Sequence, residues 1–136
     1  RYTDMMDDPG VFDVHNRYIT DEERDKLFAQ AAVVVLPYIE ASTSGVVPVA
    51  YSFCKPVIAT QVGGLPEMVE DGVTGYLVPP RDADALAAAI IDIMQDNDKR
   101  EQMGEAGREL LDREWSEDAC ARKTMVVYKH AIGLAT

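Results

Sequence analysis

Short apolar runs separated by helical spacing predict an alternation of strands and helices along this chain. Three runs are apolar without a polar residue at every second position, which is typical of strands covered on both faces in a parallel sheet. These runs are Ala31 to Leu36, Val57 to Ala59 and Gly75 to Val78. Val11 to Asn16 mixes β-branched and aromatic residues after the turn pair Pro9-Gly10 and predicts a further strand.

The segments between these strands have helical spacing. Thr20 and Glu23 form a capping box that predicts the start of an amphipathic helix. Its apolar face holds Leu27, Phe28 and Ala31, and the apolar face of the next helix holds Val46, Val49, Ala50 and Phe53. A short helical turn is expected over residues 65–70. Strands that alternate with helices imply right-handed βαβ units, so the predicted class is α/β with a Rossmann-like open parallel sheet.

The remainder of the chain predicts helices only. Asp82, Asp98 with Glu101, and Ser116 each stand where a helix N-cap is expected. The first of these helices has an apolar stripe of Leu86, Ile90, Ile93 and Met94. We therefore expect one partial domain over residues 1–136, with a Rossmann-like part at 11–95 followed by C-terminal helices at 98–132.

Composition narrows the functional classes. The chain has 136 residues, of which 47% are hydrophobic, and its formal net charge is -11. Such a charge repels nucleic acid, and no apolar run approaches the roughly 20 residues of a membrane span, so neither a nucleic-acid partner nor an integral membrane segment is expected.

Two further features concern the setting of the chain. Cys54 and Cys120 lie in apolar stretches and suggest buried thiols in a reducing compartment. We therefore expect a cytoplasmic location, or a peripheral one at the inner face of the membrane in a full-length protein. The chain opens on Arg1 without the pattern of a signal peptide, so we expect a fragment.

The chemistry of the chain is concentrated in residues 36–45, LPYIEASTSG, where a buried strand meets three hydroxyl residues and a glycine before a helix. Pro48 has no N–H and fits only in the first helical turn, so the helix should start near Ser44 or Gly45. The amides of Gly45, Val46 and Val47 would then point outward and hold phosphate or sugar oxygens. Ordinary helix capping by residues 42–44 is the alternative.

A second glycine turn, Gln61 to Glu67 (QVGGLPE), follows the next predicted strand. Alone it fits a tight strand-to-helix turn. Because both turns follow parallel strands, they should converge at the edge where open α/β sheets bind ligands. Glu67 begins a short helix, where a carboxylate is favourable for dipole reasons alone, and a ligand role is the other interpretation.

As an ordered set, these motifs resemble the C-terminal domain of glycosyltransferase family 4 (group 1), the retaining enzymes with the GT-B fold. The set comprises Leu36-Pro-Tyr38, Ser44-Gly45, Lys55-Pro-Val-Ile-Ala-Thr60, Gly63-Gly-Leu-Pro-Glu67, Asp71-Gly72, Gly75-Tyr-Leu-Val-Pro79, Asp82 and Trp115-Ser116. The resemblance runs from about Asn16 to the end of the chain.

The resemblance implies a nucleotide-diphosphate sugar, with UDP or GDP as its nucleotide, bound mainly by this domain. The acceptor, a glycan, lipid or small molecule, would be bound by a missing N-terminal domain, and no metal would be required. Developing charge on the diphosphate would be offset by amides and basic side chains. The donor-binding residues implied are Arg17, Tyr18, Ile19, Ser42, Thr43, Ser44, Gly45, Val46, Gly63, Gly64 and Glu67.

The chain departs from the family at two places. The two glutamates that the family usually has fall on Ala41 and Val49, so donor recognition differs or activity is lost. Glu40 is one residue away and is the candidate catalytic carboxylate if the loop shifts, with a solvent-facing role as the alternative. The region that supplies the family's first strand and its diphosphate-gripping basic residues would precede Arg1, so weak binding, an inactive fragment and self-association through an exposed sheet edge are expected.

Two hypotheses follow. The first is transfer of a sugar from a nucleotide donor with retention at the anomeric carbon. The second is a non-catalytic, degenerate GT-B module that keeps the sheet and has lost both carboxylates.

Overall fold

The chain folds around a parallel three-stranded sheet, which a computed structural model describes within residues 8–133. The strands are β1 (Val34–Leu36), β2 (Val57–Thr60) and β3 (Gly75–Val78), in that spatial order. Val34 lies opposite Val57, which lies opposite Gly75. The carboxyl ends of the strands therefore meet at one edge, and the predicted α/β class is confirmed.

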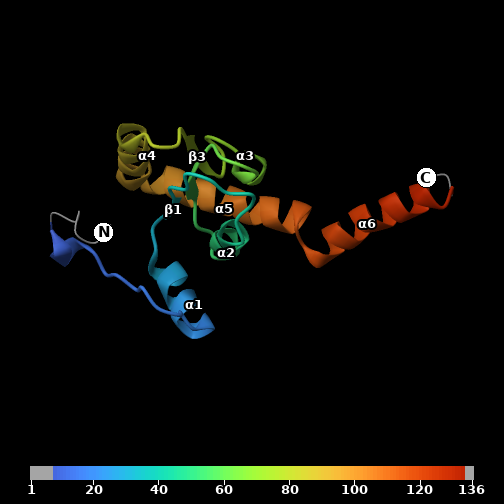
Figure 1. The fold of residues 1–136 in the computed structure, drawn as a ribbon, viewed down its shortest axis with the longest axis horizontal. Coiled ribbons are helices and arrows are strands. Elements are labelled where there is room, and N and C mark those ends of the chain that lie inside the picture. The colour runs from blue at the N-terminus through green and yellow to red at the C-terminus, as the bar shows by residue number, and fades with distance from the viewer. Residues whose placement is uncertain (1–7, 134–136) are drawn as a thin grey trace.

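Helices cover both faces of this sheet. Figure 1 shows α4 and α2 on opposite sides of the strands, with α5 running alongside and α6 extending away from the body. None of the helices within residues 8–133 is both long and apolar enough to cross a bilayer. The helices are η2 (a 3-10 helix, Pro9–Val11), α1 (Asp21–Gln30), α2 (Val46–Ser52), α3 (Leu65–Met68), α4 (Ala83–Gln95), α5 (Asn97–Glu114) and α6 (Glu117–Ala131).

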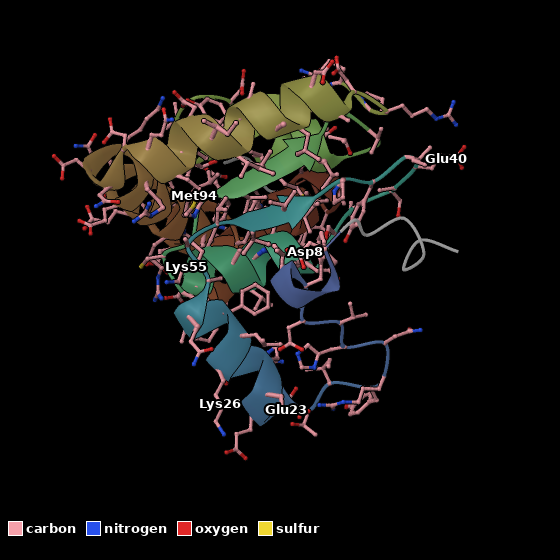
Figure 2. The ribbon with its side chains drawn as sticks, turned by 90° about the vertical axis from the view of Figure 1, so that its left-hand side faces the viewer. Asp8, Glu23, Lys26, Glu40, Lys55 and Met94 are labelled. Carbon is pink, nitrogen blue, oxygen red and sulfur yellow. The ribbon has the colours of Figure 1, made fainter. Side chains whose placement is uncertain are left out.

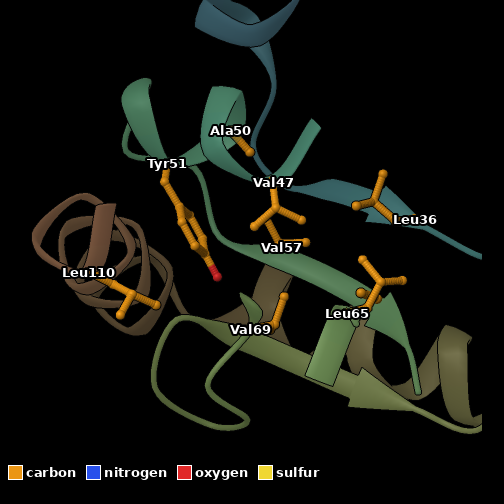
Figure 3. Close-up of a cluster of buried hydrophobic side chains, with 9 residues drawn as sticks. Leu36, Val47, Ala50, Tyr51, Val57, Leu65, Val69 and Leu110 are labelled. Carbon is orange, nitrogen blue, oxygen red and sulfur yellow. The ribbon is translucent and has the colours of Figure 1, made fainter. Parts of the chain in front are cut away.

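Strand β2 separates two apolar clusters. Alternate side chains of a strand point to opposite faces, so Val57 and Ala59 lie with α2 while Ile58 lies with α4. Figure 3 shows the α2 side, where Leu110 of α5 closes the cluster. Every residue of β2 is buried, as expected for a strand covered on both faces.

Strand β1 is shorter and less covered than predicted. It spans Val34–Leu36 within the predicted run of 31–36, and Leu36 alone among its residues is buried. Its neighbour on one side is β2, and no strand of residues 8–133 lies on its other side. An edge strand buries less of its surface, which explains the half-buried valines.

The strand predicted at Val11 to Asn16 is wrong. Residues 9–11 form η2 and residues 12–16 have no regular structure. Val11 and Phe12 are exposed, at 73% and 50%. A strand exists only where its N–H and C=O groups pair with another strand, and within residues 8–133 this segment pairs with none.

Two helices bury different residues from those predicted. Helix α2 buries Val47, Ala50 and Tyr51, because α5 packs on its Tyr51 side. Of the predicted face, Ala50 is therefore confirmed as buried, whereas Val46, Val49 and Phe53 are only half-buried. Helix α1 starts at the predicted capping box but buries no residue, and Ala31 lies just beyond its end. Its apolar face touches the core only in part, since Phe28 packs against the main apolar cluster and stacks on Phe53 with ring centroids 5.8 Å apart.

The cap at Asp98 is also wrong. Asp96 is the N-cap of α5, and its carboxylate accepts the amide of Lys99 at 2.9 Å. The caps at Asp82 and Ser116 are confirmed, each accepting the amide three residues on.

The expectation of buried thiols is wrong as well, because Cys54 and Cys120 are both exposed.

Candidate functional site

The loop from β1 to α2 is held by Ser44. This side chain is buried, its hydroxyl oxygen accepts the amide of Val46 at 3.2 Å, and it lies 3.5 Å from the hydroxyl of Tyr38. Helix α2 begins at Val46 with Gly45 as N-cap. The predicted helix start is therefore confirmed, and Ser44 acts as a local cap in this structure.

The three amides expected to face a ligand differ in their surroundings. Val46 donates its N–H to Ser44, and Val47 is fully buried, so neither amide is open. Gly45 is exposed. The prediction that all three amides point outward is therefore wrong for two of them in this structure.

The second glycine turn touches the first loop directly. The amide of Gly64 donates to the carbonyl of Ser42 at 2.6 Å. Gly63 has φ +53, and a Cβ on it would lie 1.7 Å from the carbonyl oxygen of Ala41. Only glycine lets the two backbones come this close. The predicted convergence of the two turns at the carboxyl ends of the strands is confirmed.

Polar side chains surround this junction. Ser42, Thr43 and Glu67 are exposed, as is Glu40 in the same loop as Ser42. Glu40 makes no hydrogen bond or ion pair within residues 8–133. Hydroxyls and backbone amides at such an edge can hold sugar hydroxyls and phosphate oxygens.

Thr60 of β2 supports the first loop, a role that the sequence pattern did not assign to it. Its hydroxyl donates to the carbonyl of Tyr38 at 2.6 Å, just beyond the end of β1. Thr60 is nevertheless buried, at 4% exposure. The signal was a lone hydroxyl residue at the end of an apolar strand, where a buried hydroxyl needs a partner.

The predicted loop at Arg17, Tyr18 and Ile19 is not brought to the junction. The guanidinium of Arg17 donates two hydrogen bonds, of 2.7 and 2.9 Å, to the carboxylate of Glu23. This contact, aided by the amide of Thr20, lowers the pKa of the Glu23 carboxyl to about 2. Figure 2 shows Glu23 well apart from Glu40.

Arg17 is the one cation among the predicted site residues, and it is engaged in an ion pair at the start of α1. No hydrogen bond within residues 8–133 joins residues 17–19 to the Ser42 loop. Within the same residues, no group of three or more His, Cys, Asp or Glu side chains is placed to hold a metal ion.

Comparison with known proteins identifies the family. Residues 15–110, which include both glycine-containing turns, match the family described as glycosyl transferases group 1. The chain belongs to this family. The fold is therefore that of a group 1 glycosyl transferase.

Individual relatives agree with this assignment. The chain is 38% identical over 86 residues to a GDP-mannose-dependent alpha-(1-6)-phosphatidylinositol monomannoside mannosyltransferase of Mycobacterium tuberculosis, covering 63% of this chain and 20% of the relative. It is 36% identical over 126 residues to alpha-maltose-1-phosphate synthase of Mycolicibacterium smegmatis, covering 88% and 32%.

A solved structure is also similar. Sucrose-phosphate synthase from Thermosynechococcus elongatus matches with a TM-score of 0.72 and 33% identity, over 85% of this chain and 29% of that one. The chain thus spans a third or less of the length of these relatives. The activity of a whole transferase is accordingly a matter for proposal.

Proposed function

We propose that this chain provides the nucleotide-sugar-binding half of a retaining glycosyltransferase of family 4. A longer protein would bind the acceptor in a second domain and transfer the sugar in the cleft between them. Membership in the group 1 family supports sugar transfer as the reaction class.

The contact between Ser42 and Gly64 carries the proposal. It joins the loop after β1 to the turn after β2 at the carboxyl edge of the sheet, where the side chains of Ser42, Thr43 and Glu67 are exposed. The exposed hydroxyls of Ser42 and Thr43 would contact the sugar or diphosphate, together with the backbone of Gly45. Ser44 would act by fixing the loop, since its hydroxyl caps Val46.

The donor would be a UDP- or GDP-sugar bound without a metal ion. The mannosyltransferase of Mycobacterium tuberculosis is GDP-mannose-dependent by name, which makes GDP-sugars the first to test. Arg17 would have to break its ion pair with Glu23 before its guanidinium could bind the nucleotide of the donor.

A degenerate, non-catalytic module is the second candidate. Ala41 and Val49 occupy the positions that the family resemblance gives to glutamates, and neither side chain can act as a carboxylate.

For the transferase proposal, Glu40 is our candidate for the catalytic carboxylate, because it is exposed in the same loop as Ala41.

Calorimetry with UDP, GDP, ADP and their sugar conjugates tests the proposal. We expect one nucleotide family to bind, and Thr43→Ala to weaken that binding by roughly 3- to 10-fold through loss of a hydrogen bond. Thr124, which is also exposed, lies on α6, and Thr124→Ala is the matched control that should bind as the parent does. Absence of binding to every nucleotide, both in this chain and in one extended at its N-terminus, would favour the degenerate module.

We also propose that the chain self-associates through β1. The two edges of the sheet differ, because backbone groups of β3 are already hydrogen-bonded to the turn that precedes it. The amide of Gly72 donates to the carbonyl of Gly75, and the carboxylate of Asp71 accepts the amide of Leu77 at 2.9 Å. Val33, Val34 and Val35 line instead an apolar groove of about 260 Å³ with Leu27, Phe28 and Ala31.

Sedimentation velocity over a dilution series tests this association. A concentration-dependent dimer should disappear in Val33→Lys, because an edge lysine opposes strand pairing. A monomer at all concentrations would contradict it.

A further inference from the structure

Helices α2 and α3 are joined below the proposed site by Tyr51. This side chain is fully buried, and its ring stacks on Trp115 with centroids 6.2 Å apart and planes 8° apart. Its hydroxyl donates to the carbonyl of Met68, the last residue of α3, at 3.2 Å, and lies 2.6 Å from the hydroxyl of Thr74. Figure 3 shows the tyrosine crossing from α2 into the apolar cluster beside Leu110 and Val69.

The number of hydroxyl hydrogens decides which group donates in each of these hydrogen bonds. The Tyr51 hydroxyl has one hydrogen, which the Met68 carbonyl receives, so Tyr51 must accept from Thr74. The Thr74 oxygen in turn accepts the amide of Glu70 at 3.0 Å. Burial raises the pKa of Tyr51 to about 12, so its hydroxyl keeps this hydrogen throughout the neutral range. Three hydrogen bonds therefore follow one another: the Glu70 amide donates to Thr74, the Thr74 hydroxyl to Tyr51 and the Tyr51 hydroxyl to the Met68 carbonyl.

We infer that Tyr51 is a positioning residue for donor binding, one that sets the Gly63–Glu67 turn against the Ser42–Gly45 loop. Helix α2 follows the Ser42–Gly45 loop, and α3 follows the Gly63–Glu67 turn. The buried Tyr51–Met68 bond joins these helices from within the core, while Gly64–Ser42 joins the turns themselves. This role rests on the proposed function, but its effect on the Gly64 amide does not.

Three variants and one control separate a positioning role from an effect on stability alone. Tyr51→Phe removes the hydroxyl and keeps the stacked ring. Thr74→Val removes the other hydroxyl at equal shape, and Thr74→Ser restores it. Trp115→Phe is the matched control, because it weakens the stacking on Tyr51 without touching either hydroxyl.

Amide exchange by NMR and nucleotide calorimetry are the two measurements. We expect Tyr51→Phe and Thr74→Val each to speed exchange of the Gly64 amide about tenfold and to weaken nucleotide binding by roughly 3- to 10-fold. Thr74→Ser should behave as the parent. Trp115→Phe should lower the melting temperature while the affinity and the protection of Gly64 relative to the core stay unchanged.

Different failures have different meanings. If the parent binds no nucleotide, the proposed function fails, and the exchange of Gly64 still decides the link between the helices. If the parent binds and Tyr51→Phe binds equally well with Gly64 still protected, the positioning role is overturned. If Tyr51→Phe does not fold, the comparison of Thr74→Val with Thr74→Ser tests the positioning role by the same two measurements.

Discussion

Replacing Gly63 by alanine should separate the two turns of the proposed site. The residue has φ +53, where an alanine is strained by about 1–2 kcal/mol. Its Cβ would also lie 1.7 Å from the Ala41 carbonyl oxygen and 3.0 Å from that of Ser42. Both obstacles are backbone atoms, so no side-chain rotation relieves them, and overpacking adds about 1–3 kcal/mol. We expect a loss of stability of about 2–5 kcal/mol.

Gly72→Ala is the matched control for this variant. Gly72 has φ +76, but nothing lies within 4 Å of a Cβ built there, so only the strain of about 1–2 kcal/mol applies. Urea denaturation should therefore find Gly63→Ala the less stable of the two.

Calorimetry should find nucleotide binding weakened in Gly63→Ala alone. The reasoning is refuted if both variants lose equal stability and bind nucleotide equally well. The close approach of Gly63 to Ala41 would then not be what positions the two turns.

Three further variants test local interactions. Arg17→Met should raise the pKa of Glu23 from about 2 toward 4.5, followed by NMR titration of the carboxyl; the lowered value contributes stability above pH 4.5 that is lost as pH falls toward 2, and an unchanged pKa would contradict the ion pair. Thr20→Ala should reduce amide protection in α1 by about 1 kcal/mol without shifting global unfolding, since α1 buries no residue; a global shift would contradict this. Gly104→Ala should cost about 1–3 kcal/mol in urea denaturation, because its Cβ would lie 2.0 Å from the Cys54 carbonyl oxygen, and parental stability would refute that packing.

The features predicted correctly from sequence depend on neighbouring residues. The capping box at Thr20, the caps at Asp82 and Ser116 and the strand at Gly75–Val78 each follow from side chains within a few positions. The meeting of the two turns also followed, because parallel strands leave their carboxyl ends at one edge.

Apart from the cap placed at Asp98 in place of Asp96, the errors in the predicted strand and helix faces concern contacts between distant parts of the chain. A strand at 11–16 needs a pairing partner, which no local pattern supplies. The buried face of α2 depends on α5, whose Gly107 lets the Tyr51 ring lie against it: a Cβ there would be 2.4 Å from the ring. Tyr51 therefore turns inward, although periodicity favoured Phe53. The polar partners of Tyr51 also come from residues 17 and 23 positions away.

The position of Glu40 follows from the same contacts. For Glu40 to take the place of Ala41, the loop would have to slip by one residue. Such a slip would break the Gly64–Ser42 bond of 2.6 Å and remove the Ala41 carbonyl from its close approach to Gly63. The Thr60 bond to the Tyr38 carbonyl fixes the other side of the loop. A carboxylate role for Glu40 therefore requires it to reach the donor from its present exposed position, with a substrate seated farther out than a carboxylate at position 41 would hold it.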